Sequence, residues 1–253
     1  MDQVRYATYN VAKYLDTSTV KADKTFYKTT LPSDMIFTKY DTFTSDDKVK
    51  KLTREFNIQY KACIGSLNYL LYTRVDLSFA VQKLAKFSEN PGKLHFEGLV
   101  HLLRYIRDNK TFELKYYAYM NDVPVTDLLR QATIKTENHL IAFYDSSCKD
   151  CTETVRSTGA YIITYQGRPI DHGTHVPGPV DKSSAESEYN ASCTSRMALA
   201  HFRMLINELL NKDIYIVPEE APMIVLDSKS YMCMAKNGKD TKHTRQIARK
   251  VHF

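Results

Sequence analysis

Long apolar runs are missing from this 253-residue sequence, and cysteine, glycine and proline are scarce. No stretch approaches the roughly 20 apolar residues that cross a bilayer, and the opening MDQVRYATYN lacks the apolar core of a secretory signal. The five cysteines are odd in number and irregularly spaced, which argues against a disulfide framework and fits reduced thiols. We therefore expect an intracellular protein, cytoplasmic or nuclear, that does not span a membrane.

Tryptophan is absent, and neither sign of charge dominates strongly. The formal net charge is +6 with an isoelectric point near 8.9, which favours polyanionic partners only weakly. With 43% hydrophobic residues, the chain is long enough for one large or two modest domains. The 18 tyrosines would permit stacking on nucleic-acid bases, although packing explains most of them.

The first 119 residues are predicted to be mostly helical with a basic outer face. Residues 1–45 are mixed in character, with a turn around Pro32, and a helix is expected after Ser45, which could cap it. A second periodic segment runs from Cys63 to Ala85 as one helix, which ENPG ends. The third predicted helix carries an apolar stripe of Phe96, Leu99, Val100, Leu103 and Ile106.

Residues 120–138 are predicted to be a linker, and residues 139–253 have a different texture. The predicted elements are, in order, a strand at HLIAFYDSS, a hairpin at GAYIITYQGRPIDHG, a long helix at 183–210, a strand at APMIVLDSKS and a short helix at 228–238. This order indicates an α+β domain with a mixed sheet. The long helix is expected to bury a stripe of Tyr189, Cys193, Met197, Ala200 and Leu205.

Three carboxylates fall at the ends of these elements. Asp145 and Asp227 end apolar strands, and Glu188 lies in the first turns of the long helix. Ligands gather at that edge of α/β sheets, and converging carboxylates need cations such as Mg²⁺ between them. Two such ions about 4 Å apart can drive phosphodiester hydrolysis. The alternative is a helix-initiating acid at Glu188 and turn-forming acids at Asp145 and Asp227, and spacing alone leaves both open.

Several ordered motifs carry a family resemblance. FYDSS, RSTGAYII, SSAESEYNAS, IVLDSKS and DTKHTRQIARKVHF resemble the ribonuclease H region of copia-type retrotransposon Pol polyproteins, in order and spacing. Upstream, YKACIGSLNYLLYTRVDLSFAVQKLAKFSENP and HLLRYIRDN look like the thumb or connecting region that follows the polymerase palm. The resemblance implies a ribonuclease H-like mixed sheet with flanking helices, preceded by a mostly helical thumb-like segment.

The same resemblance implies an activity and a site. The activity is hydrolysis of the RNA strand of RNA–DNA hybrids with Mg²⁺ or Mn²⁺, within a larger Pol polyprotein. Asp145, Glu188 and Asp227 match the first three acidic positions of the family and are the implied catalytic metal ligands. Glu186 is a nearby alternative, but the family pattern favours the acid before the tyrosine.

Departures from the family pattern define a second expectation. No Tyr-x-Asp-Asp motif is present, so polymerase activity is not expected; Cys148 replaces a usual aromatic and Val75 a usual proline. The family continues past RKVHF into a strand and a helix with a fourth acidic ligand. The alternative function is therefore a non-catalytic nucleic-acid-binding or structural remnant, a fragment or decayed copy. Self-association through an exposed sheet edge is expected with it.

A basic segment near the end of the sequence is a candidate nucleic-acid contact. Its side chains would hold phosphates beside the carboxylates, and the alternative is an exposed basic helix end. His243 is also a candidate proton carrier for the leaving product. The basic residues are Lys242, His243, Arg245, Arg249 and Lys250.

A zinc site is a weaker expectation. Cys148 and Cys151 form a Cys-x-x-Cys pair, and His172 and His175 follow downstream. Both the gap between the pairs and the two-residue gap between the histidines miss the usual zinc spacing. Two loop cysteines and two hairpin histidines are therefore expected instead.

Overall fold

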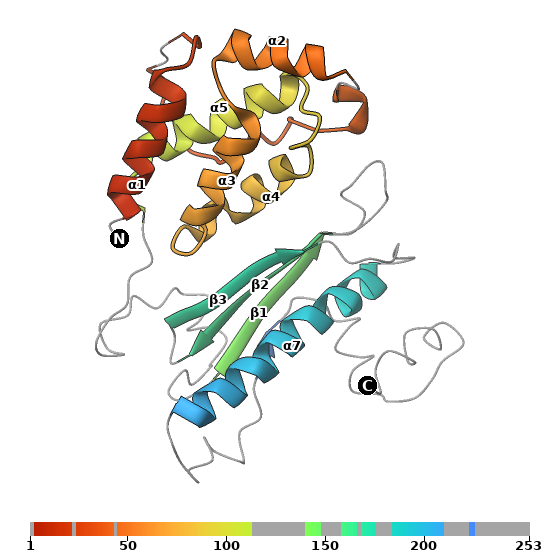
Figure 1. Cartoon of the computed structure of the whole chain (residues 1–253). Helices are drawn as coiled ribbons and strands as arrows, with labels where there is room; N and C mark the ends of the chain where they lie inside the picture. The colour runs from red at the N-terminus through yellow and green to blue at the C-terminus, as the bar shows by residue number, and fades with distance from the viewer. Residues whose placement is uncertain are drawn as a thin grey trace. The chain divides into compact units, whose positions relative to one another are not determined.

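The computed structural model describes residues 3–21, 24–42, 45–112, 140–147, 158–165, 168–175, 184–209 and 223–225. The chain divides into two compact units, unit 1 over residues 1–115 and unit 2 over residues 116–253 (Figure 1). The predicted linker at 120–138 lies within a stretch outside the described residues. None of the described helices is long and apolar enough to cross a membrane.

Unit 1 is helical in its described parts. One helix was not predicted: α1, which buries only Ala7 and Asn10 and therefore leaves a weak apolar period in the sequence. The turn at Pro32 is present, since the Met35 N–H donates to the Pro32 carbonyl at 3.3 Å. The elements are α1 Gln3–Asn10, the π-helix η1 Val11–Asp16, the 3₁₀ helix η2 Lys39–Asp41, α2 Asp46–Phe56, α3 Tyr60–Leu70, the 3₁₀ helix η3 Val75–Leu77, α4 Ser78–Ala85 and α5 Lys93–Asp108.

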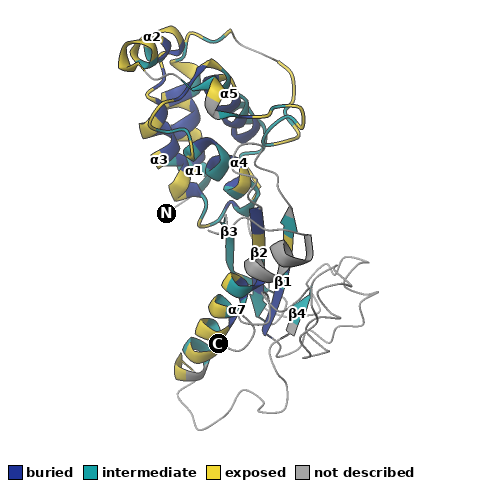
Figure 2. Cartoon of the chain, turned by 90° about the vertical axis from the view of Figure 1, so that its right-hand side faces the viewer, coloured by how far each residue is buried: buried dark blue, intermediate teal, exposed yellow. Residues whose placement is uncertain are grey.

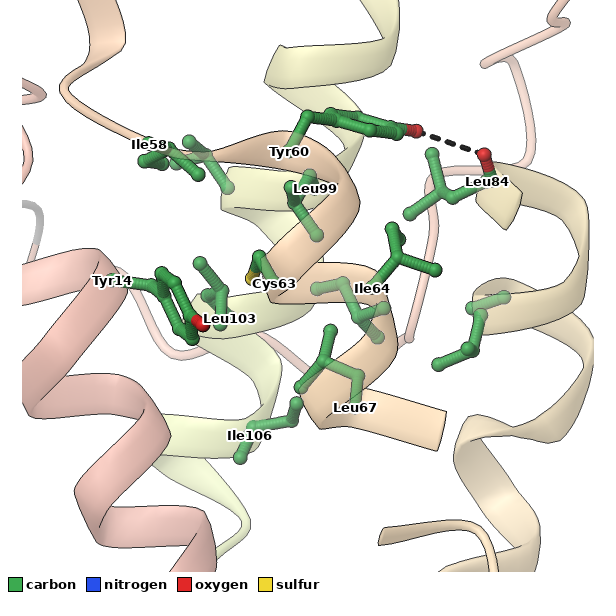
Figure 3. Packing of buried hydrophobic residues seen from close by; sticks show 14 of the residues in the cluster. Tyr14, Ile58, Tyr60, Cys63, Ile64, Leu67, Leu84, Leu99, Leu103 and Ile106 are labelled. Atoms are coloured by element: carbon green, nitrogen blue, oxygen red, sulfur yellow. Dashed lines mark hydrogen bonds between the residues drawn. The ribbon is translucent and has the colours of Figure 1, made fainter. Parts of the chain in front are cut away.

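The core of unit 1 forms around α3 and α5. The predicted α5 stripe is confirmed, and its leucines pack against Cys63 and Leu67 of α3 (Figure 3). The Tyr60 hydroxyl donates to the Leu84 carbonyl at 2.9 Å and so ties α3 to α4. In Figure 2 the helices of unit 1 carry both buried and exposed stretches, and α2 is largely exposed. Each fully buried leucine stabilises the fold by roughly 1.5–3 kcal/mol.

The start of α2 agrees with the sequence, whereas the segment predicted as one helix from 63 to 85 is two. Ser45 is the residue before α2, but its side chain makes no capping hydrogen bond. The helix α3 ends at Leu70, and α4 begins at Ser78 after the short helix η3. The break turns Arg74 inward, where only 2% of its surface is exposed. The apolar period of the sequence did not reveal this break, because apolar residues continue on both sides of it.

An ion pair occupies the break between α3 and α4. Arg74 donates from Nε and Nη2 to the two carboxylate oxygens of Asp76, at 2.9 and 2.8 Å. The Tyr105 hydroxyl of α5 donates to Asp76 Oδ2 at 3.0 Å. The buried charge is thus matched by a two-point contact, which joins the turn to α5.

A second buried polar group, His95, lies at the start of α5. Its Nδ1 accepts a hydrogen bond from the Gly92 N–H at 2.9 Å. The ring stacks on Phe37 with centroids 5.3 Å apart and lies 4.1 Å from the ring centroid of Phe87. Burial lowers the pKa of His95 to about 4, so the imidazole is neutral near pH 7.

Unit 1 is expected to lose stability as the pH falls from 6.5 to 4, because His95 takes up a proton more readily in the unfolded state than in the folded one. The unfolded histidine titrates near pH 6.5 and the folded one at about 4, so the unfolded state binds more protons between these values. The free energy of unfolding should therefore fall by up to about 3 kcal/mol from pH 6.5 to 4. Urea unfolding of the whole chain, followed by circular dichroism across this range, measures the fall.

The variant His95→Asn is the matched control for that measurement. Its side-chain oxygen can accept the Gly92 N–H, but it does not titrate. We expect it to be less stable than the wild type at pH 7 and to depend less on pH below 6.5. An equally steep fall in both proteins would show that His95 is not the group responsible.

In its described parts, unit 2 has a four-stranded mixed sheet and one long helix. The strand order is β3-β2-β1-β4, with β1 antiparallel to β2, β2 antiparallel to β3, and β1 parallel to β4. The predicted α+β class, with a mixed sheet preceded by helices, is confirmed. The predicted short helix at 228–238 lies outside the described residues. The elements are β1 Leu140–Ser147, β2 Thr158–Tyr165, β3 Arg168–His175, α7 Ser184–Leu209 and β4 Met223–Val225.

The helix α7 packs on the sheet with a different stripe from the predicted one. Met197 is 74% exposed and Ala200 is also exposed, so the predicted stripe is wrong at these two positions; the side chain of Tyr189 lies outside the described ones. Leu199 instead packs with Leu140, Ala142 and Ile163 of the sheet. Among the described side chains of α7, the buried or sheet-packed ones are Ser192, Ser195, Ala198, Leu199, Phe202 and Ile206.

Two buried serines explain the error. Ser192 and Ser195 have no exposed surface, although they do not count as apolar in a sequence pattern. The Ser195 hydroxyl donates to the Ser192 carbonyl at 2.8 Å, which satisfies it inside the helix. Because these side chains are small, α7 can approach the sheet closely at these positions. The hydrophobic pattern alone therefore predicted the wrong face of the helix.

The corrected stripe predicts opposite effects at two nearby positions of α7. Leu199→Ala should destabilise unit 2 by about 2–4 kcal/mol, because it removes buried methyl groups from the cluster on the sheet. Met197→Ala should change stability by less than about 0.5 kcal/mol, because its side chain is exposed. Thermal unfolding of the two variants, followed by circular dichroism, compares them. Equal losses of stability in the two variants would instead support the stripe predicted from the sequence.

Candidate active site

Asp145 lies on β1, two residues before the strand ends. It pairs with Ala160 of β2, so it belongs to the sheet and not to a turn. The turn-forming alternative is therefore wrong for this residue. The pairing with β2 holds the backbone of Asp145 within the sheet, and two residues earlier Phe143 also pairs with β4.

The Asp145 carboxylate is exposed and lightly engaged. Its Oδ1 accepts a hydrogen bond from the Ser146 N–H at 2.7 Å. Within the described ranges, no Lys, Arg or His side chain forms an ion pair with it. Strand alternation places Asp145 on the sheet face opposite Ala142, which packs with α7. A group on α7 that shares a ligand with Asp145 must therefore reach it around the end of the sheet.

The first turns of α7 lie at that same end. The helix runs antiparallel to β1, so its N-terminus is close to the end of β1 (Figure 1). Position 188 precedes Ser192 by four residues and continues the stripe 192, 195, 199, 202 and 206 by one turn. Position 186 is two residues away, on the other side of the helix. Helical geometry therefore favours Glu188 over Glu186.

The strand β4 runs parallel to β1 and ends beside it. Phe143 pairs with Val225, and Asp145 and Asp227 each come two residues later in the sequence. Asp227 itself lies outside the described residues, as does the whole basic segment of Lys242, His243, Arg245, Arg249 and Lys250. Two carboxylates on adjacent parallel strands can share a ligand at one end of the sheet only if they follow paired positions by a similar number of residues, as Asp145 and Asp227 do.

The zinc alternative concerns two histidines that the structure describes and two cysteines that it does not. His172 and His175 lie on β3, opposite Ile162 and Gly159 of β2, while Cys148 and Cys151 lie outside the described residues. Among the side chains that the structure describes, no three His, Cys, Asp or Glu groups gather closely enough to hold a metal ion. That set does not include the side chains of Glu188 and Asp227.

A group of exposed tyrosines on α1 and α3 was missed by the sequence analysis. The helix α1 itself was not predicted, so the sequence prediction made no use of the spacing of its tyrosines and cations. The interleaving of Arg5, Tyr9 and Lys13 at intervals of four residues was the available signal.

Comparison with known proteins gives matches to Pol polyproteins. The chain is 26% identical over 195 residues to "Retrovirus-related Pol polyprotein from transposon RE2" of Arabidopsis thaliana, which covers 77% of this chain and 12% of that protein. It is 25% identical over 198 residues to the corresponding TNT 1-94 protein of Nicotiana tabacum, covering 78% of this chain and 13% of that protein. The chain thus spans about an eighth of these relatives.

A shorter relative matches about half of the chain. "Secreted RxLR effector protein 161" of Plasmopara viticola is 29% identical over 136 residues, covering 53% of this chain and 84% of that protein. No family model matches the sequence, and no solved structure matches it significantly. The resemblance predicted from the motifs is confirmed by the Pol matches: over about three quarters of its length, this chain is similar to part of the Pol polyproteins of copia-type retrotransposons.

Proposed function

We propose that unit 2 is a ribonuclease H-like domain that hydrolyses the RNA strand of RNA–DNA hybrids. The observation that carries the proposal is the position of Asp145: an exposed carboxylate inside a paired strand, at the sheet end where α7 begins. The similarity to retrovirus-related Pol polyproteins supports it, because the family resemblance of the motifs implies a ribonuclease H region in such polyproteins. Within such a polyprotein, the rest of Pol would be the covalent partner of this region.

The donor chemistry fits a hard divalent ion. Asp145, Glu188 and Asp227 offer carboxylate oxygens only, which Mg²⁺ and Mn²⁺ accept readily. Three carboxylates at one sheet end would also repel one another without a cation. When bound, two such ions would activate water and stabilise the leaving oxygen of a phosphodiester.

Each residue has a separate part in the proposal. Asp145 would provide a carboxylate on an ordered backbone, because it is paired with Ala160 of β2. Asp227 would join it through the parallel register of β4, and Glu188 from the first turns of α7. The basic residues at 242–250 would bind phosphates of the hybrid and set its position without reading its sequence. All of these roles follow from the implied family site.

The test is incubation of the purified whole chain with a hybrid whose RNA strand is labelled. We expect the RNA to be shortened when Mg²⁺ is added and to stay intact with a chelator, while single-stranded RNA of the same sequence is spared. Salt-sensitive binding of the hybrid without cleavage would overturn the proposal and support the non-catalytic alternative.

A further inference from the structure

A row of tyrosine rings lies on the surface of unit 1, where α1 meets α3. The ring centroids of Tyr9 and Tyr6 are 6.3 Å apart, those of Tyr6 and Tyr69 are 5.0 Å apart, and those of Tyr69 and Tyr72 are 5.9 Å apart. We call these four residues the tyrosine row. Tyr72 is 78% exposed, Tyr9 55% and Tyr69 39%, while Tyr6 is half-buried against the core. Three of the four rings are therefore open to solvent, and the half-buried Tyr6 lies between Tyr9 and the other two.

Two cations flank this row. Arg5, Tyr9 and Lys13 follow one another at intervals of four residues, which places them along one side of α1 and η1. Lys13 Nζ lies 5.7 Å from the ring centroid of Tyr9 and 4.8 Å from that of Tyr14. Arg5 and Lys13 are exposed, and neither forms an ion pair with an acid among the described residues. Their charge is thus available to an anionic ligand.

The backbone around Lys13 is unusual. The helix α1 passes directly into the six-residue π-helix Val11–Asp16, a rare form that occurs frequently at functional sites. Within η1, Tyr14 is buried and its hydroxyl lies 3.1 Å from Ser66 Oγ of α3. This contact holds η1 against α3, the helix that carries Tyr69. The π-turn therefore fixes Lys13 beside the row.

The chemistry of the surface favours one kind of partner. Exposed aromatic rings offer faces on which unpaired bases stack, and adjacent cations neutralise phosphates. A duplex keeps its bases paired and stacked within itself, so it cannot use the ring faces in this way. An apolar protein partner would use the rings but would leave Arg5 and Lys13 without a counter-charge.

We propose that the tyrosine row, together with Arg5 and Lys13, binds single-stranded nucleic acid, with bases stacked on Tyr9, Tyr69 and Tyr72. The surface lies on unit 1 and includes none of the carboxylates of unit 2. The binding requires no divalent ion and no cleavage. Its success or failure is therefore distinguishable from that of the nuclease proposal.

The test measures fluorescence anisotropy of short labelled oligothymidylate and oligouridylate, titrated with the whole chain in the presence of a chelator. Tyr9→Ala combined with Tyr72→Ala should weaken binding at least about tenfold, because each base–aromatic stack contributes substantially to affinity. Tyr40→Ala is the matched control, since Tyr40 is 84% exposed elsewhere on unit 1. It should leave the affinity within about twofold. The two oligonucleotides show whether DNA or RNA is preferred.

A charge variant and an optical signal complete the test. Lys13→Gln should reduce the slope of log affinity against log salt by about 0.7, the value for one phosphate contact on a single strand. Lys51→Gln, an exposed lysine of α2, should change it less. Because tryptophan is absent, intrinsic emission comes from tyrosine, and binding should quench it in the wild type but not in the double variant.

Three results would overturn the proposal. The first is an equal loss of affinity in Tyr40→Ala and in the double variant. The second is duplex DNA that binds as tightly as the single strand and responds equally to the tyrosine changes. The third is a double variant that binds normally but loses self-association in sedimentation, which would make the row a contact between copies of the chain.

Discussion

Asp145→Asn is expected to reduce cleavage of an RNA–DNA hybrid by roughly a thousandfold. Asparagine has nearly the same shape and keeps an oxygen for the Ser146 N–H, so the strand pairing of β1 should be unchanged. What it removes is the negative charge that would hold a divalent ion. Charge stabilisation by such an ion is worth several kcal/mol, and about 1.36 kcal/mol is a factor of ten in rate. Initial rates of cleavage at saturating Mg²⁺ measure the loss.

Two acids of α7 provide the matched comparison. Glu188→Gln should lose most of the activity, whereas Glu186→Gln should retain it, because position 186 lies on another side of the helix. Glu208→Gln, at the exposed far end of α7, controls for loss of negative charge. If Asp145→Asn cleaves as fast as the wild type, the site is not at Asp145.

Metal binding gives a second readout that does not depend on turnover. A ligand that binds only the folded state raises the unfolding temperature. Mg²⁺ should therefore raise the unfolding temperature of the wild type and have a smaller effect on Asp145→Asn. A full rise in the variant would separate metal binding from this residue.

The largest expected effect on stability is in unit 1, at Asp76. Asp76→Ala should destabilise the unit by about 3–5 kcal/mol, because it leaves the Arg74 guanidinium buried without its counter-ion. The change also removes the acceptor of the Tyr105 hydroxyl. Urea unfolding followed by circular dichroism measures the loss, which is a large part of the 5–15 kcal/mol typical of a domain.

Two further variants show whether burial of the charge is the cause. Glu89→Ala removes the exposed partner of Lys61 and should cost less than about 1 kcal/mol. Arg74→Met combined with Asp76→Asn removes both charges and keeps an acceptor for Tyr105. This double variant should be more stable than Asp76→Ala. A double variant that is less stable would assign the loss to packing and not to an unpaired charge.

Elements with a strong period or clear end signals were predictable from the sequence. The α5 stripe, the β1 strand and the β2–β3 hairpin are all present where the pattern placed them. The failures have physical causes. The helix α1 buries too few apolar residues to show a helical period. The break between α3 and α4 has apolar residues on both sides, so the apolar pattern does not reveal it. In α7, two serines are buried that a hydrophobic pattern does not count.

The candidate site was predictable in type but not in geometry. Motif order identified Asp145, Glu188 and Asp227 as acids of one family pattern. Strand pairing then showed that Asp145 is not a turn residue. The stripe described from Ser192 onward would include position 188 if it continued by one helical turn. The tyrosine row needed the structure entirely, because residues 60 positions apart in the sequence, Tyr9 and Tyr69, share neighbours only after folding.

The amino-acid order alone determined the class of the chain, its similarity to Pol polyproteins and its strongest elements, because these depend on local pattern. Only the tertiary structure decided which side of α7 is buried, which residue pairs with Arg74 and which tyrosines stay exposed. Burial depends on contacts between distant segments, and local hydrophobicity does not specify them when small polar residues can pack as closely as apolar ones.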